Sequence, residues 1–82
     1  MDVPGKIKKA IVKVQPGIDE RVIISGAYLK EDLEIDSLTM VEMALALEDA
    51  FNLTLKDDEL GGVKTVGDII SLIESRLTVQ YA

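Results

Sequence analysis

Apolar residues recur at the spacing of an α-helix in three stretches of this 82-residue chain, and this pattern limits the possible folds most. We expect a helix between Pro4 and Pro16, a second over 37–51, and a third from 65 or 66 to 76 or 77. Their apolar faces are formed by Ile7, Ala10, Ile11 and Val14, by Leu38, Val41, Ala44, Leu45, Leu47 and Phe51, and by Val66, Ile69, Ile70, Ile73 and Leu77. Only the run 22–24 resembles a strand, and it has no partner strand to pair with. The sequence therefore predicts an all-α fold.

The segments between these helices complete the expected architecture. A long loop over about 15–36 follows the first helix, and its apolar residues Leu29, Leu33 and Ile35 are expected to contact the core. A short helical turn over 57–60 ends at two glycines, and Thr65 is the expected N-cap of the last helix. We expect one domain over residues 1–82: a small antiparallel four-helix bundle, with three main helices, one short helix and a long first loop.

Composition excludes several classes of function. The chain has no cysteine and no histidine, which removes disulfides, thiolate zinc sites, cysteine nucleophiles and the usual general base. No apolar run approaches the roughly 20 residues of a membrane span, and the N-terminus lacks the apolar core of a signal peptide. We expect a cytoplasmic protein with no catalytic residue and no metal site.

The negative charge is concentrated in the middle of the chain. Residues 31–59 contain ten acids and one base, a net charge of −9, whereas the remainder contains five acids and eight bases. Such a segment repels nucleic acid and anionic membranes and attracts basic protein surfaces. On charge alone, a face that is merely solvated is the favoured interpretation, because runs of charge are usually just solvated.

Ser37 is the most informative single residue. It lies in Asp36-Ser37-Leu38, where the second helix is expected to begin. A helix N-terminus offers unpaired N–H groups and partial positive charge, which favour an anion attached there. Because serine is also a favoured N-cap, a purely structural role is the alternative.

The surrounding residues make the motif more specific. In order, they are Glu31-Asp32-Leu33-Glu34-Ile35-Asp36-Ser37-Leu38, Met40-Val41-Glu42, Ala46-Leu47-Glu48-Asp49-Ala50-Phe51 and Lys64-Thr65-Val66-Gly67-Asp68. This series resembles the acyl carrier proteins, and most closely those of actinobacterial type II fatty acid synthesis. The first helix matches that family only in pattern and is unusually rich in lysine.

The resemblance implies a function and a cofactor. Ser37 would carry a covalent 4'-phosphopantetheine arm, Asp36 and Leu38 would complete the attachment motif, and Asp36 would contact the phosphopantetheinyl transferase or a metal ion that the transferase brings. The structural alternative for Asp36 is helix capping, and the two roles are compatible. The protein would hold acyl thioesters for enzymes of fatty acid or polyketide biosynthesis without being an enzyme. Separately, the core is mainly aliphatic and contains methionine, so an acyl chain could be sheltered between the helices, with Met40, Met43, Leu47, Ile69 and Ile73 as candidates to line the space. The favoured alternative is that these five are ordinary core residues.

The expected partners are the phosphopantetheinyl transferase, an acyltransferase, a ketosynthase and other synthase enzymes with basic docking surfaces. The resemblance assigns their docking to the acids Glu42, Glu48 and Asp49, with the apolar pair Val41 and Leu45 between them. The alternative is that this apolar pair belongs to the core. We expect a monomer that binds neither nucleic acid nor membrane.

Two other functions stay open on the sequence, and a third is excluded. A peptidyl or aryl carrier of a nonribosomal pathway remains possible within the same class, and an unmodified helical docking module remains possible outside it. A calcium loop beginning at Asp32, Glu34 and Asp36 is rejected, because Ser37 and Met43 stand where such a loop requires glycine and a bidentate glutamate.

Overall fold

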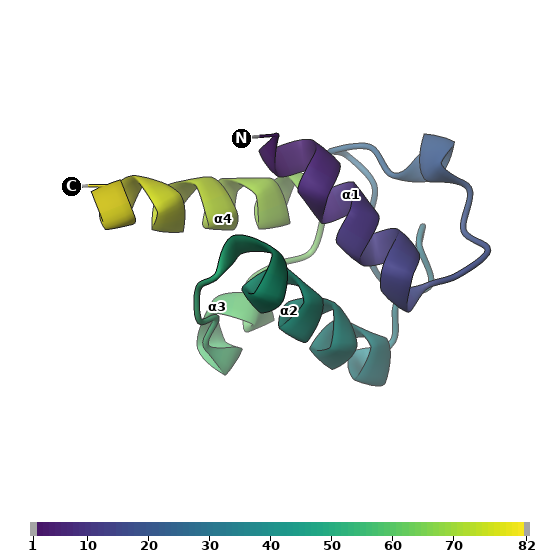
Figure 1. Ribbon diagram of the computed structural model, residues 1–82. Coiled ribbons are helices and arrows are strands. Elements are labelled where there is room, and N and C mark those ends of the chain that lie inside the picture. The colour runs from purple at the N-terminus through teal and green to yellow at the C-terminus, as the bar shows by residue number, and fades with distance from the viewer. Residues whose placement is uncertain (1, 82) are drawn as a thin grey trace.

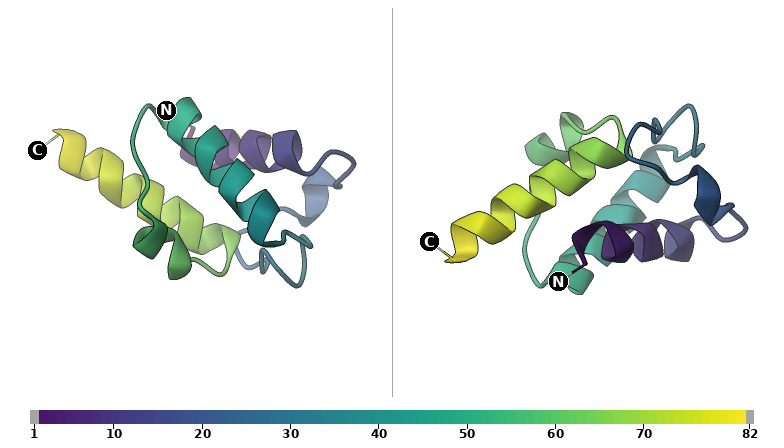
Figure 2. Two further views of the ribbon diagram at one scale, coloured as in Figure 1. Left: turned by 90° about the horizontal axis from the view of Figure 1, so that it is seen from below. Right: turned by 90° about the horizontal axis from the view of Figure 1, so that it is seen from above.

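The computed structural model describes residues 2–81, and within them the fold is all-α, as predicted (Figure 1). The elements are α1 (Val3–Val14), the short 3-10 helix η1 (Glu20–Val22), α2 (Ser37–Phe51), α3 (Asp57–Gly61) and α4 (Val66–Tyr81). α1 packs against both α2 and α4 and runs in the opposite direction to them (Figure 2). The C-terminal end of α4 projects beyond the other helices. No helix among the described residues is long and apolar enough to cross a membrane.

Local signals in the sequence set most of the helix ends. α1 begins with Pro4 in its first turn, and the side chain of Asp2 accepts a hydrogen bond from the N–H of Gly5 at 3.1 Å. At α4 the predicted N-cap Thr65 is confirmed, since its Oγ1 accepts from the N–H of Asp68 and the Asp68 carboxylate accepts from the N–H of Thr65, both at 3.1 Å. α4 runs about one turn past its predicted end, because residues 78–81 contain no glycine or proline to stop it.

The core lies where the three long helices and the first loop meet. Its fully buried side chains, with relative exposure below 2 %, are Ile7, Ile11, Leu29, Leu33, Met43, Leu47, Ile69 and Ile73. The loop residues Leu29, Leu33 and Ile35 are all buried, as expected from the sequence. The run 22–24 is no strand: it lies in and after η1, and only its middle residue, Ile23, is buried.

The predicted apolar face of α2 is partly wrong. Leu38, Val41 and Leu45 are 71 %, 57 % and 60 % exposed, whereas the other predicted residues, Ala44, Leu47 and Phe51, are buried. The helix also buries Met43, which was not assigned to this face. α2 is apolar around most of its circumference, so spacing alone does not identify the side that packs. Packing against α1 and the shared core decides it, and one apolar stripe stays in solvent.

Backbone hydrogen bonds hold the first loop against the start of α4. The N–H of Leu29 donates to the carbonyl of Lys64 at 2.9 Å, and the N–H of Gly67 donates to the carbonyl of Ser25 at 2.8 Å. A Cβ atom at position 67 would stand 2.9 Å from that Ser25 oxygen, so the approach requires glycine. These contacts place the loop beside the N-terminus of α2.

Candidate functional site

Ser37 is the first residue of α2, and Asp36, not Ser37, is its N-cap. Asp36 has extended backbone angles, and its Oδ1 accepts a hydrogen bond from the N–H of Thr39 at 2.8 Å. The alternative that Ser37 is a structural cap is therefore wrong, because aspartate, an equally good cap, already occupies that position. The Ser37 side chain is exposed and forms no hydrogen bond within residues 2–81. Its hydroxyl is available for chemistry.

The electrostatics at this helix end are set by the cap. The backbone N–H of Thr39, above all, lowers the pKa of the Asp36 carboxyl below its ordinary value of 3.8. Asp36 is consequently ionised at neutral pH, and it uses one of the N–H groups at the helix start. The remaining field of the helix N-terminus favours an anion on the neighbouring residue. No group of three or more potential ligand side chains in the described part of the chain is arranged to hold a metal ion.

A hollow of about 500 Å³ opens beside Ser37. Its lining comes from the first loop, the start of α2 and the segment before α4: Tyr28, Leu29, Lys30, Glu31, Ile35, Asp36, Ser37, Met40, Val63 and Lys64. Of the five residues expected to shelter an acyl chain, Met40 alone is among them. The other four are core residues with relative exposure of 1 % or less, so the space between the helices is filled.

The lining residues from the loop were missed at the sequence level. Leu29 and Ile35 were identified only as core contacts, and Val63 was not singled out at all. Their place beside Ser37 depends on the return of the loop to α4, which is a long-range contact. The only local signal for it is the unusual length of the loop.

One face of α2 presents apolar and acidic side chains together. We call it the α2 stripe; it consists of Leu38, Val41, Glu42, Leu45 and Asp49, which are all exposed. The alternative that Val41 and Leu45 are core residues is wrong. The predicted docking role of these residues, and of Leu38 in the attachment motif, stays a prediction.

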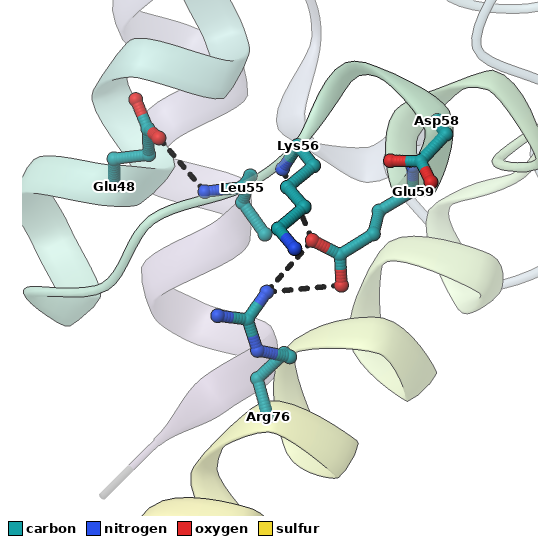
Figure 3. A network of polar contacts seen from close by, with 6 residues as sticks. All are labelled: Glu48, Leu55, Lys56, Asp58, Glu59 and Arg76. Atoms are coloured by element: carbon teal, nitrogen blue, oxygen red, sulfur yellow. Dashed lines mark hydrogen bonds and ion pairs between the residues drawn. The ribbon is translucent and has the colours of Figure 1, made fainter.

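Glu48, the third predicted docking acid, has a structural contact instead of a free carboxylate. Its Oε2 accepts a hydrogen bond from the N–H of Leu55 at 2.8 Å (Figure 3). Leu55 is buried, so this bond ties the segment after α2 to the helix. Glu48 is therefore less available to a partner than Glu42 or Asp49.

A second polar contact fixes the short helix α3 against α4. The carboxylate of Glu59 accepts from the N–H of Lys56 at 3.0 Å and pairs with the guanidinium of Arg76 at 2.7 Å (Figure 3). The N–H of Lys56 and, to a smaller degree, Arg76 lower the pKa of the Glu59 carboxyl below its ordinary value of 4.5.

The sequence family described as the phosphopantetheine attachment site matches residues 10–73. The chain belongs to this family of carrier proteins. Its structure is also similar to that of a Mycobacterium tuberculosis protein assigned as an acyl carrier protein, with a TM-score of 0.81 and 26% sequence identity over 89% of this chain and 96% of that one. The resemblance to acyl carrier proteins and the four-helix fold expected from the sequence are thereby confirmed.

Family membership establishes the cofactor and the general role of this carrier protein. It has a covalently attached 4'-phosphopantetheine and an acyl carrier role. Such a carrier works with a phosphopantetheinyl transferase and with synthase enzymes. The alternative of an unmodified docking module disagrees with this membership.

Proposed function

We propose that the chain carries acyl groups as thioesters on a 4'-phosphopantetheine arm attached to Ser37 Oγ, and delivers them to enzymes of fatty acid or polyketide biosynthesis. One observation supports this most. Ser37 holds an exposed hydroxyl without a hydrogen-bond partner in the first turn of α2, while Asp36 caps the helix.

The chain supplies the nucleophile, and the transferase supplies the rest. Ser37 Oγ forms the new phosphodiester bond to the phosphorus of the pantetheine phosphate, and the bond from that phosphorus to the nucleotide part of coenzyme A breaks. The serine proton goes to a base of the transferase, since the chain has no histidine. Asp36 stays ionised beside the reacting serine, where it can contact the transferase or a metal ion that the transferase brings.

The proposal includes how the carrier acts. It is a single domain over residues 1–82 that works as a cytoplasmic monomer and catalyses no step itself. The α2 stripe is the surface that meets basic docking surfaces of the partner enzymes. Its acids would steer the approach, and its apolar residues would be buried on contact.

The attachment is tested by incubating the protein with a phosphopantetheinyl transferase and coenzyme A and measuring the intact mass. The wild type should gain one arm, and Ser37→Ala should gain none. Ser71→Ala is the matched control, because Ser71 is also an exposed helical serine, on α4. Since Asp36 caps α2, Ser37→Ala should keep the circular dichroism of the wild type. A mass gain in Ser37→Ala would show that the attachment point is elsewhere.

A further inference from the structure

The first helix has an exposed positive edge that the carrier role does not account for. α1 contains four lysines and no acid, in a chain of net charge −6. Lys6, Lys9 and Lys13 follow one another at i, i+3 and i+7, so they share one edge of the helix. Lys6 contacts α2 within the protein: its Nζ donates to the carbonyl of Ala50 at 3.5 Å and lies 5.6 Å from the centre of the Phe51 ring.

Lys9 and Lys13 have no such partner. Both are exposed, and neither forms an ion pair or a side-chain hydrogen bond in the described part of the chain. Their ammonium groups are therefore available to a charge outside the molecule. An acid in a partner protein would meet two such groups, one helical turn apart.

A groove joins this lysine edge to the α2 stripe. One hollow of about 580 Å³ is lined by Lys13 on the α1 side and by Glu42, Leu45 and Asp49 on the α2 side. An adjoining hollow of about 270 Å³ is lined by Lys9 and shares Lys13 and Asp49 with the first. Lys13 and Asp49 line the same space without forming an ion pair. The groove thus presents both signs of charge, each still free for a partner.

We propose that Lys9, Lys13 and the α2 stripe form one docking surface of two signs, which selects partner enzymes with an acidic strip beside a basic one. This inference rests on the proposed function, in which α2 meets basic surfaces. A partner that is basic throughout would bring its positive charge against Lys9 and Lys13, within a Debye length of about 10 Å at 0.1 M salt. A partner with an acid at that place gains attraction instead. Repulsion of wrong partners in this way creates specificity as effectively as attraction of the right one.

The test uses two helical peptides of equal length as probes. One has lysines along its whole polar face, and the other has lysines on one edge and glutamates on the next. Each is titrated into the isotope-labelled protein after its arm has been verified by intact mass, and the backbone amide shifts give the dissociation constants. The wild type should prefer the two-sign peptide, with shifts in both α1 and α2.

Lys13→Glu and Lys8→Glu form a matched pair of variants. Both change the net charge by the same amount on the same helix, but Lys8 lines neither hollow. Lys13→Glu should shift the preference toward the basic peptide by roughly two- to fivefold, the range for one exposed charge pair, whereas Lys8→Glu should leave the preference unchanged. The shift should diminish in 1 M salt.

Three results would overturn the inference. The first two are equal affinity of the wild type for both peptides and equal effects of the two variants on the preference. The third is binding of the wild type to vesicles that contain phosphatidylserine, if Lys13→Glu abolishes this binding and Lys8→Glu retains it. The last result would assign the lysine edge to a membrane surface. Failure of the proposed function is recognised separately, because it appears as a missing arm in the mass measurement that precedes the titration.

Discussion

Because α2 has both exposed and buried apolar residues, substitutions on this helix should affect docking and stability separately. Two leucines of the helix allow this to be measured. Leu45 and Leu47 stand two residues apart on the same helix, but Leu45 is 60 % exposed and Leu47 is 0 % exposed. Leu45→Ala should therefore impair docking and lower the stability of the fold only slightly. Leu47→Ala should do the reverse.

The size of each effect follows from the exposed fractions. Full burial of a leucine contributes about 1.5–3 kcal/mol, so the two-fifths of Leu45 that is buried contributes roughly 0.6–1.2 kcal/mol to folding. The better helix propensity of alanine offsets a small part of that loss. Leu47→Ala removes a fully buried side chain and leaves a cavity, at a cost of about 2–5 kcal/mol. For a domain of this size, about 2 kcal/mol lowers the melting temperature by at least about 8 °C.

The docking effect comes from the other three-fifths of Leu45. If a partner covers that surface, its loss removes roughly 0.9–1.8 kcal/mol of binding, which corresponds to a fall of about 5- to 20-fold in kcat/KM. Initial rates of arm transfer from coenzyme A by the phosphopantetheinyl transferase measure this, and thermal unfolding followed by circular dichroism measures stability. Rates should be taken well below the melting temperature of each variant. A Leu45→Ala protein that melts as low as Leu47→Ala, or that accepts the arm at the wild-type rate, would refute the reasoning.

Two other predictions follow from the polar contacts. Glu48→Ala removes the carboxylate that accepts from the partly buried N–H of Leu55 and should cost about 1–3 kcal/mol, seen as a melting temperature lower by at least about 4 °C. Glu42→Ala on the exposed face should stay within about 0.5 kcal/mol of the wild type. Equal melting of the two variants would contradict the role given to Glu48. Asp36 and Glu59 have lowered pKa values, so their contribution to stability is present above the ordinary values of 3.8 and 4.5 and is lost as the pH falls through the lower folded values. The melting temperature should be nearly constant from about pH 8 to pH 5, since the chain has no histidine. At pH values below about 5 the melting temperature should decrease. Asp36→Asn keeps a capping oxygen and should reduce the fall, and an undiminished fall in that variant would contradict the assignment.

The helices could be predicted because their signals are local. Pro4 and Thr65 mark helix starts whatever the rest of the chain does, and the N-terminus of α2 follows from one aspartate before an apolar run. The site residue Ser37 was likewise identified from its neighbours. The sequence offered both Ser37 and Asp36 as the cap, because serine and aspartate are both good caps, and only the backbone angles of Asp36 decide between them.

Features that depend on long-range packing could not be predicted. The buried side of α2 was partly misassigned, since Leu38 and Met43 are both apolar and only packing against α1 and the shared core separates them. The hollow beside Ser37 needs the loop to fold back, which depends on Gly67 and its contact with Ser25. Neither contact leaves a periodic signal in the sequence.

The most direct test of the central claim is to locate the arm in the wild-type protein. Cleavage after lysine and arginine separates the serines of this chain: the peptide 31–56 contains Ser37 as its only serine, 22–30 contains Ser25, and 65–76 contains Ser71 and Ser75. After modification by the transferase, tandem mass spectrometry should find the phosphopantetheine on the peptide 31–56, with fragment masses that place it on Ser37. An arm on either of the other two peptides, with 31–56 unmodified, would contradict the account.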